Sequence, residues 1–252
     1  MLCGVSCRIP GAALAMPASE QGHQLYLAHC AACHGPTGRG NGPAAIALDV
    51  PPRDFRDEPF RYISTLNGVP TEEDLRQTIR SGRHFGAMPA RPNLRDVEVH
   101  LLAEYVREIN RLGWAERLAR EFADDEDMTP EEIEEIALER VTPDEPIPVP
   151  CPPPGFHSDT EVGRELYLNS CASCHGPTGQ GDGMEKPKDD RGRPIAVRDL
   201  TTGQFRGGVG PDEVFKRIRC GVPGTPMPAQ VGLTDEEVWQ LVHYVRYLAG
   251  WR

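Results

Sequence analysis

Two copies of the pentapeptide Cys-x-x-Cys-His constrain this chain of 252 residues more than any other feature of its sequence. They span residues 30–34 and residues 171–175. Cysteines three positions apart share one face of a helical turn, so both thiols reach the same edge of a porphyrin ring. The histidine that follows them then lies beneath the ring. The motif is typical of haem attached through two thioether bonds, so the sequence predicts two covalently bound haem c groups.

The two motifs also predict which residues hold each haem. The predicted thioether residues are Cys30, Cys33, Cys171 and Cys174, and the predicted proximal iron ligands are His34 and His175. A structural zinc site would need four ligands, and neither motif has a second Cys-x-x-Cys or a His-x-x-His at zinc-finger spacing. A thioredoxin-like redox pair would need a βαβ setting, of which the sequence shows no sign. Haem attachment is therefore the favoured interpretation.

The motifs belong to a longer internal repeat. Residues 22–42 and 163–183 align without a gap and are identical at 14 of 21 positions. Such self-similarity predicts two homologous modules, each with an opening helix that ends at the motif. The glycine-rich loop after each motif is not preceded by a strand or followed by Gly-Lys-Ser/Thr, so it does not resemble a phosphate-binding loop. We expect it to form turns around the haem edge.

A methionine lies in a proline-containing loop of each module. Met88 lies 54 residues after His34, and Met227 lies 52 residues after His175. Each loop follows a short predicted helix, residues 71–80 or 211–219, that ends at a glycine. A thioether held by a neighbouring proline suits a distal iron ligand, so we predict that Met88 and Met227 bind iron. His84 is the only nearby rival for Met88, and the second module has no equivalent histidine.

Each module repeats an arginine-containing segment between the motif and the methionine loop. Arg53-Asp54-Phe55 and Phe60-Arg61 match Arg198-Asp199-Leu200 and Phe205-Arg206 at the same spacing. Two interpretations stay open. The phenylalanines pack in the core while the charges are solvated, or one arginine of each set meets a haem propionate, because a guanidinium fork fits a carboxylate.

An amphipathic helix is predicted to close each module, at residues 96–110 and 234–249. Its apolar positions recur in the same register in both copies. Gly22 and Gly163, on the opening helices, mark the points where we expect the closing helix to cross. The predicted fold class is therefore all-α, with two tandem helical domains.

Most of the net charge lies between the modules. Residues 113–150 contribute −10 of the formal net charge of −11. Thr129 and Pro130 predict the start of a short helix, and the proline-rich residues 143–154 predict an extended spacer. The acidic residues 124–127 lack the ligand spacing of a calcium loop. The sequence leaves open whether this segment separates the modules or straps them together, and whether its charge steers a basic redox partner.

The start of the chain and the remaining cysteines raise questions that the sequence does not decide. Residues 1–18 resemble the end of a secretory signal that begins upstream, and Cys3 and Cys7 would be removed with it. Cys151 and Cys220 either form a disulfide or stay as two separate thiols. The sequence contains no apolar run of about 18 residues, so it predicts no membrane span.

Together, the Cys-x-x-Cys-His helix, the methionine in a proline loop and the closing helix resemble class I c-type cytochromes, in a two-haem, tandem-domain bacterial form. The resemblance implies a small helical fold per haem and axial pairs of His34 with Met88 and His175 with Met227. It divides the chain into a signal remnant (1–18), a first haem domain (19–112), an acidic and proline-rich linker (113–156) and a second haem domain (157–252). The long acidic linker departs from compact two-haem cytochromes.

The expected function is electron transfer rather than catalysis. With methionine on both irons there is no open position for substrate, and no catalytic base recurs beside the motifs. We expect a periplasmic carrier that passes single electrons from a dehydrogenase or quinol-oxidising complex to a terminal oxidase or reductase. Its partners would be redox proteins, including docking to a membrane respiratory complex, and not nucleic acid. The alternatives are a di-haem peroxidase and the cytochrome subunit of a larger complex.

Overall fold

The computed structural model describes residues 18–83, 87–125, 127–152 and 156–251. Among these residues every regular element is a helix, apart from one isolated bridge between Lys188 and Pro194. The prediction of an all-α protein is therefore confirmed. None of the described helices is long and apolar enough to cross a membrane.

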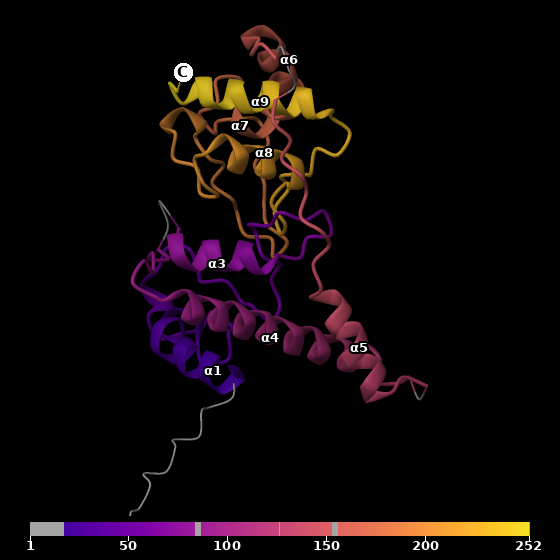
Figure 1. Cartoon of the computed structure of the whole chain (residues 1–252). Coiled ribbons are helices and arrows are strands. Elements are labelled where there is room, and N and C mark those ends of the chain that lie inside the picture. Colours follow the sequence, from indigo (N-terminus) through magenta and orange to yellow (C-terminus); the bar gives the residue numbers. More distant parts are fainter. Residues whose placement is uncertain (1–17, 84–86, 126, 153–155, 252) are drawn as a thin grey trace, which may run out of the picture.

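Two helical domains stack on one another, joined by a connecting segment along one side (Figure 1). The first contains α1 (Ala18–His29), α2 (Ala31–His34), the 3₁₀ turn η1 (Ala45–Ala47), α3 (Glu72–Ser81) and α4 (Asp96–Glu121). The connection contains α5 (Pro130–Arg140). The second domain contains α6 (Thr160–Ser170), α7 (Ala172–His175), the 3₁₀ turn η2 (Leu200–Thr202), α8 (Pro211–Cys220) and α9 (Asp235–Leu248). The tandem arrangement predicted from the repeat is thus observed.

The opening and closing helices of each domain cross in close contact at a glycine. A Cβ atom added to Gly22 on α1 would lie 2.8 Å from the carbonyl oxygen of Leu101 on α4. A Cβ on Gly163 of α6 would lie 2.7 Å from the carbonyl oxygen of Gln240 on α9. Both distances are too short for a side chain at these positions. The prediction of a close crossing at these two glycines is confirmed.

Each domain has its own hydrophobic core around this crossing. Tyr26 of α1 and Tyr167 of α6 are fully buried, and their rings lie 5.3 Å from those of Tyr105 and Tyr244 on the closing helices. The remaining core residues of the first domain come from α3, α4 and the loop at Phe55. Those of the second come from α8, α9 and the loop at Leu200 and Phe205. The apolar stripes predicted on the closing helices are the buried faces of α4 and α9.

The closing helix of the first domain is longer than its predicted end at residue 110. α4 continues to Glu121 and is tied to the loop after η1 by several contacts, among them an ion pair between Glu116 and Arg56. The Asn110 side chain donates a 2.6 Å hydrogen bond to the Phe55 carbonyl, and Arg117 lies 3.3 Å from Asp57. The acidic segment therefore begins on the surface of the first domain.

The rest of the acidic segment folds back onto α4. α5 begins where predicted, with Thr129 accepting a hydrogen bond from the Glu132 backbone. It packs against α4 by burying Ala137 and Val141, and Arg111 of α4 pairs with Glu134 of α5. The segment is consequently a helical pair attached to the first domain rather than a free arm.

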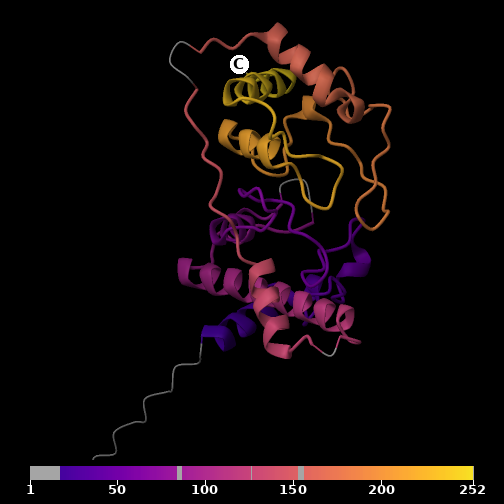
Figure 2. The same ribbon diagram turned by 90° about the vertical axis from the view of Figure 1, so that its right-hand side faces the viewer.

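The proline-rich residues 143–152, which we call the strap, contact both domains. The Ile147 amide donates a 2.7 Å hydrogen bond to the Ser64 carbonyl of the first domain. The Trp239 indole of α9 donates a 3.0 Å bond to the Pro150 carbonyl. The strap runs along the edge of both domains in Figure 2. Of the two alternatives left by the sequence, the structure shows the arrangement in which the segment straps the domains together.

Cys151 in the strap and Cys220 on α8 are both free thiols.

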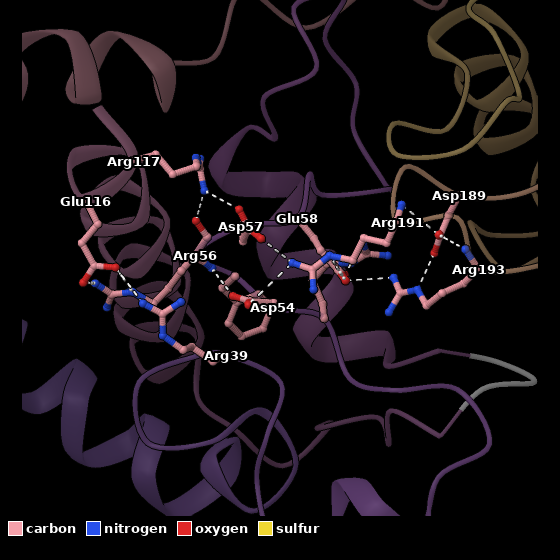
Figure 3. Close-up of polar contacts among 12 residues, drawn as sticks. Arg39, Asp54, Arg56, Asp57, Glu58, Glu116, Arg117, Asp189, Arg191 and Arg193 are labelled. Carbon is pink, nitrogen blue, oxygen red and sulfur yellow. Dashed lines mark hydrogen bonds and ion pairs between the residues drawn. The ribbon is translucent and has the colours of Figure 1, made fainter. Parts of the chain in front are cut away.

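A network of charged side chains joins the facing surfaces of the two domains (Figure 3). The Glu58 carboxylate is 3% exposed and lies 2.7 Å from Arg53 of its own domain. It also lies 3.0 Å from Arg191 and 2.8 Å from Arg193, both on a loop of the second domain. Arg193 in turn pairs with Asp189 at 2.7 Å. Arg191 also pairs with Asp57 of the first domain at 2.6 Å, so Glu58 and Asp57 together bind this loop of the second domain.

The helix crossing generates a prediction about stability. Replacing Gly163 with alanine places a methyl group against the Gln240 carbonyl, so we expect a loss of roughly 1–3 kcal/mol in the free energy of unfolding. Gly232→Ala is the matched control, because a Cβ there meets nothing within 4 Å. Thermal unfolding followed by circular dichroism measures both. Equal melting temperatures for the two variants would contradict the crossing.

The charged network generates a second prediction. Glu58→Gln leaves arginines of both domains without their shared carboxylate, so we expect the domains to separate more readily. The cost should be roughly 1–3 kcal/mol, below that of a fully buried pair, because Arg191 and Arg193 are 37% exposed. Small-angle X-ray scattering should show a larger radius of gyration. Glu73→Gln, at a carboxylate 80% exposed, is the control and should leave the radius unchanged.

Candidate haem-binding sites

Each Cys-x-x-Cys-His motif forms a single helical turn directly after the opening helix. The turns are α2 and α7, and the cysteine before each occupies its N-cap position. The Tyr26 hydroxyl donates a 2.8 Å hydrogen bond to the Gly35 carbonyl, and the Tyr167 hydroxyl donates an equal bond to Gly176. Because both tyrosines are fully buried, these bonds fix the end of each motif against its opening helix.

The predicted proximal histidines are oriented by the same contact in both domains. His34 Nδ1 lies 3.0 Å from the Arg53 carbonyl oxygen, and His175 Nδ1 lies 3.1 Å from that of Arg198. A carbonyl only accepts, so Nδ1 carries the proton and Nε2 is left with a free lone pair. Burial also lowers the pKa of both imidazoles, which favours the neutral form that binds metal.

The glycine-rich loops close onto the motifs as predicted. The Gly40 amide donates a 2.8 Å bond to the His34 carbonyl, and the Gly181 amide does the same to His175. The amides of Gly38, Gly40 and Gly42 all donate to carbonyls of residues 33–35, and those of Gly179, Gly181 and Gly183 to carbonyls of residues 174–176, so these donors are not available to a phosphate. The loops therefore serve to hold the histidine turns in place.

The methionine loops are held by equivalent backbone bonds. The Arg83 amide donates a 2.8 Å bond to the Met88 carbonyl, and the Val222 amide donates a 3.0 Å bond to the Met227 carbonyl. Both bonds join the loop to the end of the preceding helix, α3 or α8. His84, the predicted rival of Met88, lies outside the described residues.

A cavity of about 450 Å³ in the second domain brings the predicted residues together. Cys171, Cys174, His175 and Met227 all line it. Its other walls are mostly apolar and include Leu200, Phe205, Val214, Ile218 and Val245. The volume lies within the range of about 300–1,000 Å³ typical of cofactor pockets. An apolar cavity with two thiols and an imidazole on one side and a thioether on its wall fits a haem.

The cysteine environment argues against a reactive thiol pair. Burial raises the pKa of Cys30 and of Cys171 to about 11, so both thiols are protonated at neutral pH. Reactive redox cysteines instead have lowered pKa values that favour the thiolate. Among the described residues there is also no cluster of three or more histidine, cysteine or acidic side chains suited to a metal ion.

Comparison with known proteins agrees with this geometry. A sequence model of the family described as cytochrome c oxidase, cbb3-type, subunit III matches residues 17–106 and again residues 158–245. The chain belongs to this family. It is a two-domain c-type cytochrome, a class that binds haem c covalently and transfers electrons.

A solved structure resembles nearly the whole cytochrome. It is a chain of the Kuenenia stuttgartiensis reducing HAO-like protein complex Kustc0457/Kustc0458, with 29% sequence identity and a TM-score of 0.76. The match covers 93% of this cytochrome and 99% of that chain. Both domains and their connection therefore have counterparts in one known protein.

Two features of the sites escaped the sequence. The histidine partners are the backbone carbonyls of Arg53 and Arg198, which no side-chain pattern reveals, although the repeated Arg-Asp pair marks their position. Arg61 and Tyr62 of the first domain line the cavity of the second. For Arg61, which matches Arg206 in the repeat, the sequence left open a solvated charge or a contact with a haem propionate, and neither interpretation indicated the other domain.

The tyrosine bond to the motif gives a third prediction. Tyr167→Phe removes the hydroxyl bonded to the Gly176 carbonyl, which keeps a 3.1 Å bond from the Gly179 amide, so we expect a loss of roughly 0.5–1.5 kcal/mol in unfolding free energy. Tyr247→Phe, at a side chain 58% exposed, is the matched control. Chemical denaturation followed by haem absorbance compares the two. A Tyr167→Phe midpoint equal to that of the control would contradict a structural role for the bond.

Proposed function

We propose that this cytochrome is a periplasmic electron carrier with two haems. Cys30 and Cys33 attach the first haem, with His34 and Met88 as its axial ligands. Cys171 and Cys174 attach the second, with His175 and Met227 as its ligands. The observation that supports this most is the meeting of both cysteines, His175 and Met227 in one cavity.

The protein's own residues prepare each site for a one-electron reaction. The bound haem iron supplies the ferric/ferrous couple. The carbonyls of Arg53 and Arg198 fix the imidazole tautomer, so no proton needs to move at Nδ1. Much of the second cavity wall is apolar, and a methionine ligand raises the reduction potential. Sites that change little between oxidation states are suited to passing electrons on.

The electron donor we propose is a dehydrogenase or a quinol-oxidising complex, and the acceptor is a terminal oxidase or reductase. Haem attached through Cys-x-x-Cys-His is typical of exported proteins, which supports a periplasmic location.

The loop at η1 suggests a partner surface beside the first motif. The Ala44 amide donates a 2.9 Å bond to the Ala32 carbonyl inside the motif, while Ile46 is 95% exposed.

A second candidate function is that of a cytochrome subunit in a larger complex. It is favoured because the similar structure is a chain of a protein complex and the matching family is described as an oxidase subunit. Co-purification of the untagged cytochrome from its native membranes and soluble fraction separates a subunit from a free carrier.

Replacing the methionines tests the proposed function. Met227→His exchanges a thioether for an imidazole, so we expect one reduction potential to fall and the near-infrared methionine-to-iron band to lose about half its intensity. Met88→His should do the same to the other haem. Met184→His is the control, because Met184 is 92% exposed.

Haem content and peroxide turnover complete the experiment. The alkaline pyridine spectrum should give two haems per chain. The wild-type protein should show no catalytic turnover with peroxide. An unchanged band in both Met88→His and Met227→His would contradict the ligand assignment, and sustained peroxide turnover would favour the peroxidase alternative instead of the carrier.

A further inference from the structure

Residues of the first domain complete the cavity of the second. Arg61 and Tyr62, on the loop between η1 and α3, line the same cavity as His175 and Met227. Arg206, which matches Arg61 in the repeat, lines it too. The two copies of one arginine therefore both face the second site.

The loop that carries Arg61 is held in place by the second domain. Arg217 of α8 donates hydrogen bonds of 3.1 Å to the Arg61 carbonyl and 3.3 Å to the Ile63 carbonyl. In return, Arg83 of the first domain donates a 2.9 Å bond to the Arg206 carbonyl. The Tyr62 ring lies between the two donors, with the Arg83 guanidinium carbon 3.3 Å and that of Arg217 5.3 Å from its centroid.

The charges around the cavity do not balance. Four of its described lining residues are arginines, and its one carboxylate, Glu213, pairs with Lys216 at 3.0 Å. The arginines are Arg61, Arg198, Arg206 and Arg217. The Nε atoms of Arg61, Arg206 and Arg217 are buried and have no hydrogen-bond partner among the described groups.

Uncompensated buried guanidinium groups are costly, and each favours a carboxylate that accepts two hydrogen bonds. Within the described part of the chain, the one ionic partner of Arg61 is Asp189 at 3.7 Å, and Asp189 is already bonded to Arg193 at 2.7 Å. The two propionates of a haem would supply the missing anions at this cavity.

We propose that Arg61 of the first domain binds a propionate of the haem attached to the second domain. Arg206 and Arg217 of the second domain bind the propionate-bearing edge of the same haem. This rests on the proposed attachment of a haem at residues 171–175. The second haem site is then complete only when the domains are docked, and its reduction potential depends on a residue of the other domain.

Electrostatics gives the direction in which Arg61 shifts the reduction potential of the second haem. Reduction adds one negative charge to the haem, so a nearby guanidinium favours the reduced state. Removing the charge with Arg61→Gln should lower the potential of the second haem. At a fixed ambient potential the ratio of oxidised to reduced second haem should rise about three- to tenfold, where tenfold corresponds to about 59 mV for one electron.

The test is spectroelectrochemical titration of the full-length holoprotein. The midpoint potential that falls in Met88→His is assigned to the first haem, and the other midpoint potential is assigned to the second. Arg61→Gln is then introduced into the wild-type and Met88→His proteins. We expect the second haem to shift and the first to shift less. Arg61→Lys, which keeps the charge, should retain most of the wild-type potential.

The matched control is Arg80→Gln, which removes a positive charge from the same domain at a residue paired within that domain, with Asp96. Small-angle scattering checks that the domains of each variant remain docked. A shift confined to the first haem, or a second-haem shift no larger than in Arg80→Gln, would overturn the proposal. If Met88→His moves neither midpoint, the ligand assignment has failed instead, and a Cys30→Ala, Cys33→Ala protein that carries only the second haem decides the role of Arg61.

Discussion

The close crossing of the opening and closing helices is the constraint on which each domain depends. Gly22 and Gly163 allow α1 and α6 to touch the backbones of α4 and α9. This contact buries Tyr26 and Tyr167, whose hydroxyls bond to the residue that ends each histidine turn. The position of the motif histidine is thereby set by the packing of two helices. The absence of a side chain at Gly22 and Gly163 therefore determines where the motif histidine of each domain lies.

The two repeats use the loop that follows the motif in opposite ways. In the first domain this loop forms η1 and leaves Ile46 exposed. In the second domain the corresponding loop contains Asp189, Arg191 and Arg193, and it binds Glu58 of the first domain. A symmetric duplication has therefore produced an asymmetric molecule, with one loop directed to solvent and the other committed to the partner domain.

Local patterns predicted much of this structure. The capping residues Thr71 and Thr129, the crossing glycines and the short helices before the methionine loops all appear where the sequence places them, because each depends on interactions within a few residues or on a repeated register. The shared cavity of His175 and Met227 also follows from the repeat, since the same spacing in two copies implies one arrangement.

Features set by contacts between distant segments could not be predicted. The extension of α4 to Glu121 depends on the Phe55 carbonyl and on Asp57, which no helical period encodes. The strap's position depends on single backbone bonds at Ile147 and Pro150. Arg61 matches Arg206 in sequence, yet it lines the cavity of the other domain, a neighbour that the repeat register alone does not reveal.

The loop of the second domain that carries Arg191 and Arg193 is longer than its counterpart in the first domain. The interval from Gly183 to Arg198 is four residues longer than the matching interval from Gly42 to Arg53, and it includes the residues that bind Glu58. The insertion lies next to a predicted haem site and ends at the neighbouring domain. Ile195, Ala196 and Val197, at the end of this loop, line the cavity of the second domain. Changing the loop by single residues would therefore alter the spacing of the two domains and the second cavity together, so the distance that an electron must tunnel between the predicted haems is coupled to the surroundings of one of them.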